Sequence, residues 1–170
     1  KTKSFMVMAT NGAWSKPHGW WNMISAAKQR GVNIIVIDAR RTKVAELATI
    51  HLQPKQGTDA ALGAGICRVL FEEGLFNKPF CDKWVYGVEE YRNYCKDFTP
   101  EKTEAITGVP ADLIVKAARM YAEGPGSFAL TSQSLSHSRN GVNSARALLN
   151  IPAIWVTSIS PEVLSSVSVL

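Results

Sequence analysis

The chain has 170 residues, of which 46% are hydrophobic and 19% are charged, a composition that excludes intrinsic disorder and fits one globular domain. The formal net charge is +5, but the basic residues are scattered, and the sequence has neither a basic helix nor zinc-finger spacing. No stretch reaches the roughly 20 apolar residues that a membrane-spanning helix needs. We therefore expect no nucleic-acid partner and no membrane span in this chain.

The cysteines give no sign of a disulfide framework or a metal site. Cys67, Cys81 and Cys95 follow one another at equal spacing, without a Cys-x-x-Cys pair or a histidine between them. Metal ligands are usually more closely paired, and an odd number of cysteines does not complete a set of disulfides. We expect free thiols, which only weakly favour a reducing compartment, so a cytoplasmic and a periplasmic location both stay open.

The first part of the chain predicts a strand–helix–strand unit. Phe5–Ala9 is a short continuous apolar run, as in a strand that is buried on both faces of a parallel sheet. Trp20–Arg30 has helical spacing and is followed by Gly31, a residue that commonly ends helices. Asn33–Asp38 contains four β-branched residues in a row and is the strongest predicted strand. Such units almost always have a right-handed crossover.

The alternation then continues. We expect a short helix over Thr42–Leu47 with Thr42 as its N-cap, a strand over Ile50–Leu52, and a helix over Ala60–Glu73 with Asp59 as its N-cap. The next three elements are short predicted helices: Lys78–Trp84, Val88–Cys95 and Pro100–Ala105.

A second alternating part follows these short helices. Pro110 begins a helix that ends before Gly124. After it we expect a strand over Ser127–Thr131, a helix over Asn140–Leu149 and a final strand over Ala153–Ile159. The whole pattern predicts an α/β fold: a three-layer, Rossmann-like domain with a mostly parallel sheet and a helical insertion between about residues 78 and 105.

Polar residues follow the first two predicted strands, at the edge where open α/β sheets bind ligands. Asn11 both donates and accepts hydrogen bonds, so it suits the polar edge of a cofactor, although a simple turn is the alternative. Asp38 can accept hydrogen bonds from ribose hydroxyls or from the N–H and amino groups of guanine. Arg40 or Arg41 can pair with a diphosphate. The alternative is a loop cap beside two solvated arginines.

Two further segments are candidates for ligand binding. Gly57, Thr58 and Asp59 stand just before a predicted helix; Gly57 allows a close backbone approach, and Asp59 adds an acceptor that favours amino groups over phosphates. An N-cap without a ligand is the alternative. His137 and Asn140 lie in a polar segment after a predicted strand, for which a flexible loop is the alternative.

The sequence offers no catalytic constellation. The serines lack a G-x-S-x-G elbow, the histidines lack metal-like spacing, and the first loop lacks the G-x-G-x-x-G fingerprint of nicotinamide-binding domains. We therefore expect no catalytic residue and no metal ligand in this chain.

The order of the motifs resembles one known family. Val36–Thr42 resembles its hydrophobic-Ile-Asp-Pro-Arg-Arg-Thr run, Gly57–Leu62 its Gly-Thr-Asp-Ala-Ala-Leu run, and Ile106–Pro110 follows in the expected place. This ordered series, over about residues 5–150, resembles the dimethyl sulfoxide reductase family of the molybdopterin oxidoreductase superfamily. Prolines of the family pattern are replaced by Gly12, Ala39 and Gln56, and the first two changes loosen their loops.

The resemblance implies that residues 1–150 are a molybdopterin guanine dinucleotide-binding domain, a fragment of a larger molybdenum or tungsten oxidoreductase. Residues 151–170 would be a divergent tail or a final strand. The residues that would contact the cofactor are Asn11, Asp38, Arg40, Arg41, Gly57, Thr58, Asp59 and Asn140. The partners would be the remaining domains of the enzyme and its electron-transfer subunits.

The family's iron–sulfur cysteines and metal ligand lie N-terminal to this region, and none is in this chain, so we expect the isolated chain to be inactive. Two alternatives stay open: a domain of a hydratase-type relative without net redox chemistry, and a stand-alone nucleotide-binding or interaction protein.

Overall fold

A parallel sheet lies at the centre of the computed structural model, which describes residues 2–124 and 126–155. Within these residues the sheet has four strands: β1 (Ser4–Met8), β2 (Asn33–Ile37), β3 (Ile50–Leu52) and β4 (Phe128–Thr131). They run parallel in the order β3-β2-β1-β4. The expectation of a mostly parallel sheet is therefore confirmed.

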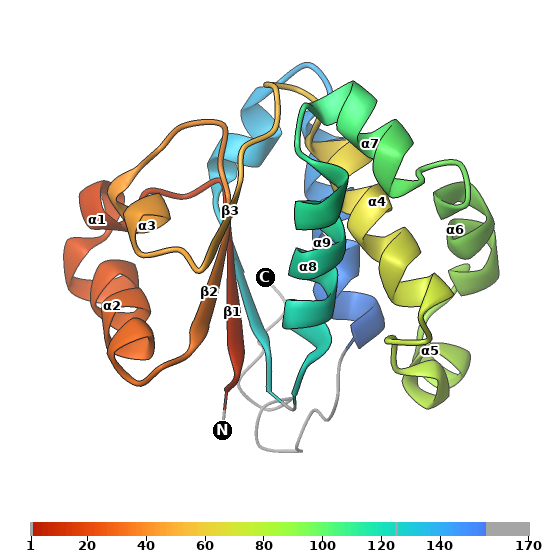
Figure 1. The fold of residues 1–170 in the computed structure, drawn as a ribbon, viewed down its shortest axis with the longest axis horizontal. Helices are drawn as coiled ribbons and strands as arrows, with labels where there is room; N and C mark the ends of the chain where they lie inside the picture. The colour runs from red at the N-terminus through yellow and green to blue at the C-terminus, as the bar shows by residue number, and fades with distance from the viewer. Residues whose placement is uncertain (1, 125, 156–170) are drawn as a thin grey trace.

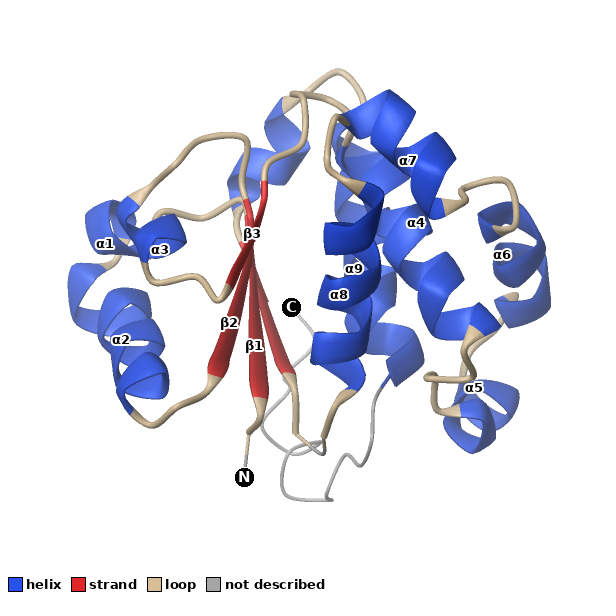
Figure 2. Cartoon of the chain, viewed as in Figure 1, coloured by secondary structure: helices blue, strands red, loops and turns tan. Residues whose placement is uncertain are grey.

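Helices cover both faces of this sheet, which gives the predicted three layers (Figures 1 and 2). One face carries α1 (Gly12–Ser15), α2 (Asn22–Gln29) and α3 (Lys43–Glu46). The other face carries α4 (Asp59–Glu72), α8 (Ala111–Ala122) and α9 (Gly141–Trp155).

The continuous apolar runs of the strands supply two separate cores. In β1, Met6 and Met8 pack into the cluster formed with α4, α8 and α9, whereas Phe5 and Val7 pack into the cluster on the α2 and α3 side. Successive side chains of a strand point to opposite faces, so a strand covered on both faces has no solvent side. Burying one such side chain fully stabilises the fold by about 1.5–3 kcal/mol.

The predicted helical insertion is present and lies on the outer side of α4 (Figure 1). It consists of α5 (Lys78–Trp84), α6 (Val88–Cys95) and α7 (Pro100–Thr107). Glycines let α4 approach its neighbours closely, because an added Cβ on Gly65 would lie 2.5 Å from Oγ1 of Thr103. On Gly63 it would lie 2.8 Å from the backbone carbon of Ala147 in α9.

Two helix starts differ from the sequence prediction. The helix expected from Trp20 is α2, which begins at Asn22 and is preceded by a π-helical turn over Pro17–Trp21. The predicted N-cap Asp59 is instead the first residue of α4, with Thr58 as the N-cap. The Thr58 hydroxyl donates to the carbonyl of Lys55 at 2.7 Å. It thus closes a local turn before the helix and does not accept a hydrogen bond from an N–H of the first helical turn. The predicted cap at Thr42 is confirmed, since its Oγ1 accepts from the Ala45 N–H.

The final strand expected over residues 153–159 is wrong where the structure describes it, because Ala153–Trp155 are helical; residues 156–159 lie outside the described residues. Helix α9 continues through Pro152, which costs about 3 kcal/mol in a helix interior. The residues on either side of this proline are buried: Ile151 before it, and Ile154 and Trp155 after it. The rings of Trp155 and Tyr121 pack together, with their centroids 5.2 Å apart. At about 1.5–3 kcal/mol for each buried side chain, their burial outweighs the cost of the proline.

Cys67, Cys81 and Cys95 are buried free thiols, as predicted. In the described part of the chain, no helix is both long enough and apolar enough to cross a membrane.

Candidate functional site

The predicted binding loops meet at one edge of the sheet. Because β2 and β4 both pair with β1 in parallel, the carboxyl ends of the three strands lie side by side, with Met8 opposite Ile37 and Thr131. The loops after these strands occupy the upper edge of the sheet in Figure 1. The expectation that Asn11 and Asp38 share an edge of the sheet is confirmed.

A cavity of about 390 Å³ opens at this carboxyl edge. It brings together four of the predicted site residues from two loops: Asp38 and Arg40 after β2, and Gly57 and Asp59 at the start of α4. The other lining residues are Ala9, Ala39, Gln56, Ser134, Leu135, His137 and Ser138.

The β2 loop holds the Asp38 carboxylate in a defined direction. Asp38 is 7% exposed, and its Oδ1 accepts a hydrogen bond of 2.8 Å from the backbone N–H of Arg40. The Arg40 side chain is 74% exposed, and its Nε lies 3.8 Å from the same oxygen. A buried carboxylate thus lies beside an accessible guanidinium. The carboxylate can accept hydrogen bonds from a base or a sugar, and the guanidinium can pair with an anion.

The second loop adds another carboxylate to the cavity. Gly57 has a φ of +82°, in the left-handed region that glycine adopts without strain, and it turns the chain into α4. Burial raises the pKa of the Asp59 carboxyl, a hydrogen bond from its own backbone N–H opposes this, and the negative charge of Asp38 raises the pKa further. Two acceptors on one cavity favour a ligand that presents hydrogen-bond donors.

Buried oxygens without partners lie at the ends of β1 and β4. Among the described residues, Thr10 Oγ1, Asn11 Oδ1 and Thr131 Oγ1 are buried and have no hydrogen-bond partner. Buried polar atoms are nearly always hydrogen-bonded to protein, water or ligand. A bound water or a polar group of a ligand would satisfy these oxygens. Asn11 belongs to this group and does not line the cavity.

A 3-10 helix over Gln133–His137 forms the far wall of the cavity. The Ser134 hydroxyl donates to the carbonyl of Ala9, which is itself in the left-handed region with a φ of 49°. Leu135 anchors the helix in the core, and His137 faces the cavity. The sequence predicted a polar segment here, but it did not identify Ala9 and Ser134 as residues of the site. Their contact joins residues that are far apart in the sequence, so no local pattern indicates it.

Three other predicted site residues do not line the cavity. Arg41 is exposed outside it, and Thr58 is occupied by the turn that precedes α4. Asn140 directly precedes α9: its carbonyl accepts from the Ser144 N–H at 3.0 Å, and its Oδ1 accepts from Asn143 at 2.8 Å.

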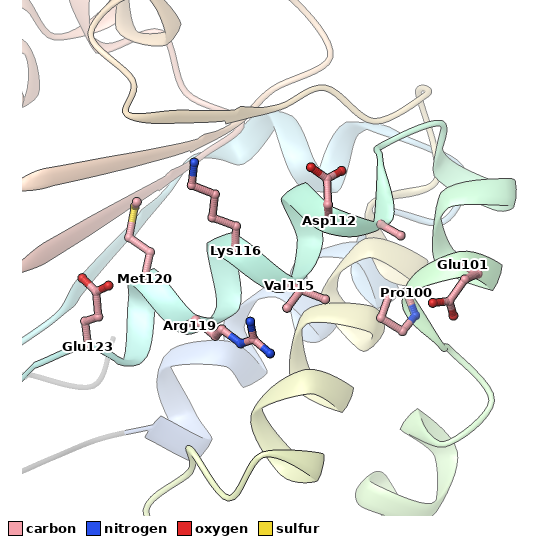
Figure 3. A pocket seen from close by; sticks show the side chains of 9 residues that line it. Pro100, Glu101, Asp112, Val115, Lys116, Arg119, Met120 and Glu123 are labelled. Carbon is pink, nitrogen blue, oxygen red and sulfur yellow. The ribbon is translucent and has the colours of Figure 1, made fainter.

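A second cavity, of about 630 Å³, lies between α7 and α8 (Figure 3). Its charged side chains do not converge: Lys116 and Arg119 point to different sides of α8. Arg119 forms a double hydrogen bond with Glu73, at 2.7 and 2.8 Å. The carboxyl edge of the sheet contributes no residue to this cavity, so we do not assign the site there. Within residues 2–124 and 126–155, no three His, Cys, Asp or Glu side chains gather as metal ligands.

Comparison with known proteins shows that the chain is similar to one part of several longer enzymes. No protein-family model matches the sequence. It is 40% identical to acetylene hydratase of Syntrophotalea acetylenica over 81% of the chain and 19% of that protein. It is 37% identical to formate dehydrogenase H of Escherichia coli over 76% of the chain and 18% of that protein. It is 34% identical to the probable oxidoreductase YoaE of Bacillus subtilis over 90% of the chain and 22% of that protein.

The fold agrees with these sequence matches. The structure superposes on acetylene hydratase from Pelobacter acetylenicus with a TM-score of 0.84 and 33% identity, over 94% of this chain and 22% of that one. The chain thus spans about a fifth of the length of the relatives that it matches. It belongs to the molybdopterin oxidoreductase superfamily, within the dimethyl sulfoxide reductase family.

Proposed function

We propose that this chain is the part of a molybdopterin-dependent oxidoreductase that binds the guanine dinucleotide arm of a molybdenum or tungsten cofactor. The observation that carries the proposal is the cavity at the carboxyl edge, which Asp38, Arg40, Gly57 and Asp59 line from two separate loops. The strand order β3-β2-β1-β4 supports the proposal, because the sheets of dinucleotide-binding domains contain the order 3-2-1-4. Those domains bind the dinucleotide at the carboxyl edge of the sheet.

The side chains present fit this group chemically. The N–H and amino groups of guanine are donors, and Asp38 and Asp59 offer acceptors on one cavity. Arg40 supplies the planar paired donors that suit a diphosphate. Asn11, with its buried and unpartnered Oδ1, would accept from a further polar group of the cofactor. Arg41, Thr58 and Asn140 have no such support, and their part in binding stays a prediction from the resemblance.

The chain would contribute binding and orientation rather than a reacting group. When bound, the metal–pterin group supplies the two-electron chemistry, and the protein fixes its position and surroundings. The remaining domains of the enzyme, and electron-transfer subunits, are the partners that this role implies. We therefore expect no activity from the isolated chain.

A hydratase without net redox chemistry is a second candidate for the whole enzyme, because an acetylene hydratase is among its relatives in both sequence and structure. The assigned site is compatible with both reactions, since it holds the nucleotide end of the cofactor in either one. The larger size of the relatives favours both enzymes over a stand-alone nucleotide-binding protein.

Calorimetric titration of the purified chain with GDP, and with ADP for comparison, tests the proposed site. We expect GDP to bind more tightly than ADP. Charge-assisted hydrogen bonds contribute about 1.5–3 kcal/mol, so Asp38→Ala should weaken GDP binding by roughly one to two orders of magnitude. Asp97→Ala, which removes an exposed carboxylate between α6 and α7, is the matched control and should bind as the wild type does. Equal binding of GDP and ADP, or an Asp38→Ala variant that binds normally, would overturn the assignment.

A further inference from the structure

Two side chains, one in β3 and one directly after it, hold the loop that carries Asp38. His51 Nε2 lies 2.9 Å from the backbone carbonyl oxygen of Asp38. Gln53 Nε2 donates to the carbonyl oxygen of the next residue, Ala39, at 2.8 Å. A carbonyl oxygen only accepts, so the bond from His51 requires a proton on Nε2. The loop after β2 is thus fastened at two consecutive peptide units by the neighbouring strand and the residue that follows it.

The second of these contacts leads directly to the carboxylate. The Ala39 carbonyl and the Arg40 N–H belong to one peptide unit, which is planar. Gln53 holds the carbonyl end of this unit, and the N–H end donates to Asp38 Oδ1 at 2.8 Å. Fixing the plane at one end therefore fixes the direction of the donor that orients the carboxylate.

The first contact fixes the preceding peptide unit. His51 binds the carbonyl of Asp38, while the Asp38 N–H donates to the carbonyl of Leu52 at 3.2 Å. The backbone on both sides of the Asp38 side chain is therefore attached to the β3 segment. Ala39 itself restrains the loop little, since alanine does not fix φ as proline does.

We propose that His51 and Gln53 are positioning residues, which hold the Asp38 carboxylate and the Arg40 backbone in the geometry that binds the guanine nucleotide. Neither residue lines the cavity, so both act through the loop. The inference rests on the proposed function, because it assigns these residues to the same site.

The test compares variants that differ only in the donor. Gln53→Met and His51→Met remove a donor at similar chain length without adding charge, whereas His51→Gln keeps a side-chain N–H. Gln29→Met, at an exposed position at the end of α2, is the matched control. Each purified chain is titrated with GDP. Hydrogen exchange of the Arg40 amide is measured against that of Ala45, whose amide donates to Thr42 in the same segment.

Loss of one neutral hydrogen bond, at about 1 kcal/mol, should weaken GDP binding about fivefold in Gln53→Met and in His51→Met. The Arg40 amide should exchange faster in both variants, while Ala45 stays protected. His51→Gln should recover most of the affinity, and Gln29→Met should match the wild type.

The results separate the two proposals. If the wild type binds GDP and both Met variants bind it equally well, the positioning role is wrong while the binding site stands. Weaker binding with unchanged Arg40 exchange also overturns the positioning role. If the wild type does not bind GDP, the proposed function fails, and this inference fails with it.

Discussion

Asp38 and Asp59 line the same cavity, although Asp38 follows β2 and Asp59 is the first residue of α4. Burial raises the pKa of Asp59, and the charge of Asp38 adds to this effect. Two carboxylates that repel one another do not stabilise the fold by themselves. Functional sites are where sequences depart from the choices that favour stability, and this pair fits that pattern.

The raised pKa of Asp59 predicts how the stability of the chain depends on pH. The folded state binds the proton of Asp59 more tightly than the unfolded state does, so this contribution to stability is complete below the ordinary value of 3.8 and is lost as pH rises through the folded pKa. Asp59→Asn is neutral at every pH and should be more stable than the wild type at pH 7. Urea denaturation at pH 7 and at pH 3 measures the difference, which should shrink at pH 3.

Asp97→Asn is the control for the change in net charge, since its carboxylate is exposed between α6 and α7. It should shift the urea midpoint little at either pH. If Asp59→Asn is less stable than the wild type at pH 7, the ionised Asp59 stabilises the start of α4, and the assigned direction of its pKa is wrong.

The Asp38→Asn variant tests whether the Asp38 carboxylate accepts hydrogen bonds from guanine or from ribose hydroxyls. An amide keeps one acceptor but turns the other position into a donor, which would face the donors of guanine. We expect GDP binding to fall nearly as far as in Asp38→Ala, by roughly one to two orders of magnitude. Calorimetry with both variants decides the matter. An Asn variant close to the wild type would mean that Asp38 accepts from ribose hydroxyls instead.

The close approach of α4 and α9 predicts a large effect of a small substitution. Gly63→Ala would place its Cβ 2.8 Å from the backbone of Ala147, where only a shift of a helix can make room. Overpacking of this kind typically costs about 1–3 kcal/mol of unfolding free energy. Gly19→Ala is the matched control, because its added Cβ would meet nothing within 4 Å beyond its chain neighbours and its own helical turn. It should change stability by about 0.5 kcal/mol or less. Thermal or urea unfolding of both variants compares them directly; equal stability would contradict the tight contact.

The buried cysteines should react slowly with thiol reagents in the folded chain. Burial raises the pKa of Cys67 strongly and that of Cys95 to about 11. The thiolate is the reactive form, and at pH 8 a thiol with that pKa is ionised in about one molecule in a thousand. A colorimetric thiol assay should detect little reaction in buffer and all three thiols in urea. Rapid reaction of a thiol in the folded chain would mean that its helix opens readily.

Local patterns were sufficient to predict most of the fold. The apolar runs of β1 and β2 are unbroken because both faces of the sheet are covered, and this made the strands recognisable without knowledge of their partners. The end of α9 could not be predicted in this way. Its continuation past Pro152 depends on the burial of Trp155 against Tyr121, a contact between distant parts of the chain.

The candidate site likewise has parts that the sequence predicts and parts that depend on contacts between distant residues. Asp38 and Arg40 follow a strand, and Gly57 and Asp59 lie at the start of a helix. Such positions can be recognised from the sequence alone. The wall formed by the 3-10 helix, and the bonds from His51 and Gln53 to the β2 loop, depend on how elements pack. Side-chain bonds to backbone carbonyls carry no sequence motif, so no pattern identified them.

The place of β4 in the sheet also determines when the site can form during synthesis. β1 is made first, yet its neighbour on one side is β4, with Phe5 paired to Phe128. The wall that contains His137 follows β4. While the ribosome is still translating the α5–α7 segment, a nascent chain therefore has Asp38 and Asp59 but no closed cavity around them. If this cavity binds the nucleotide as proposed, binding must wait until β4 and the 3-10 helix have left the exit tunnel, so the cofactor would be loaded only after these elements have folded.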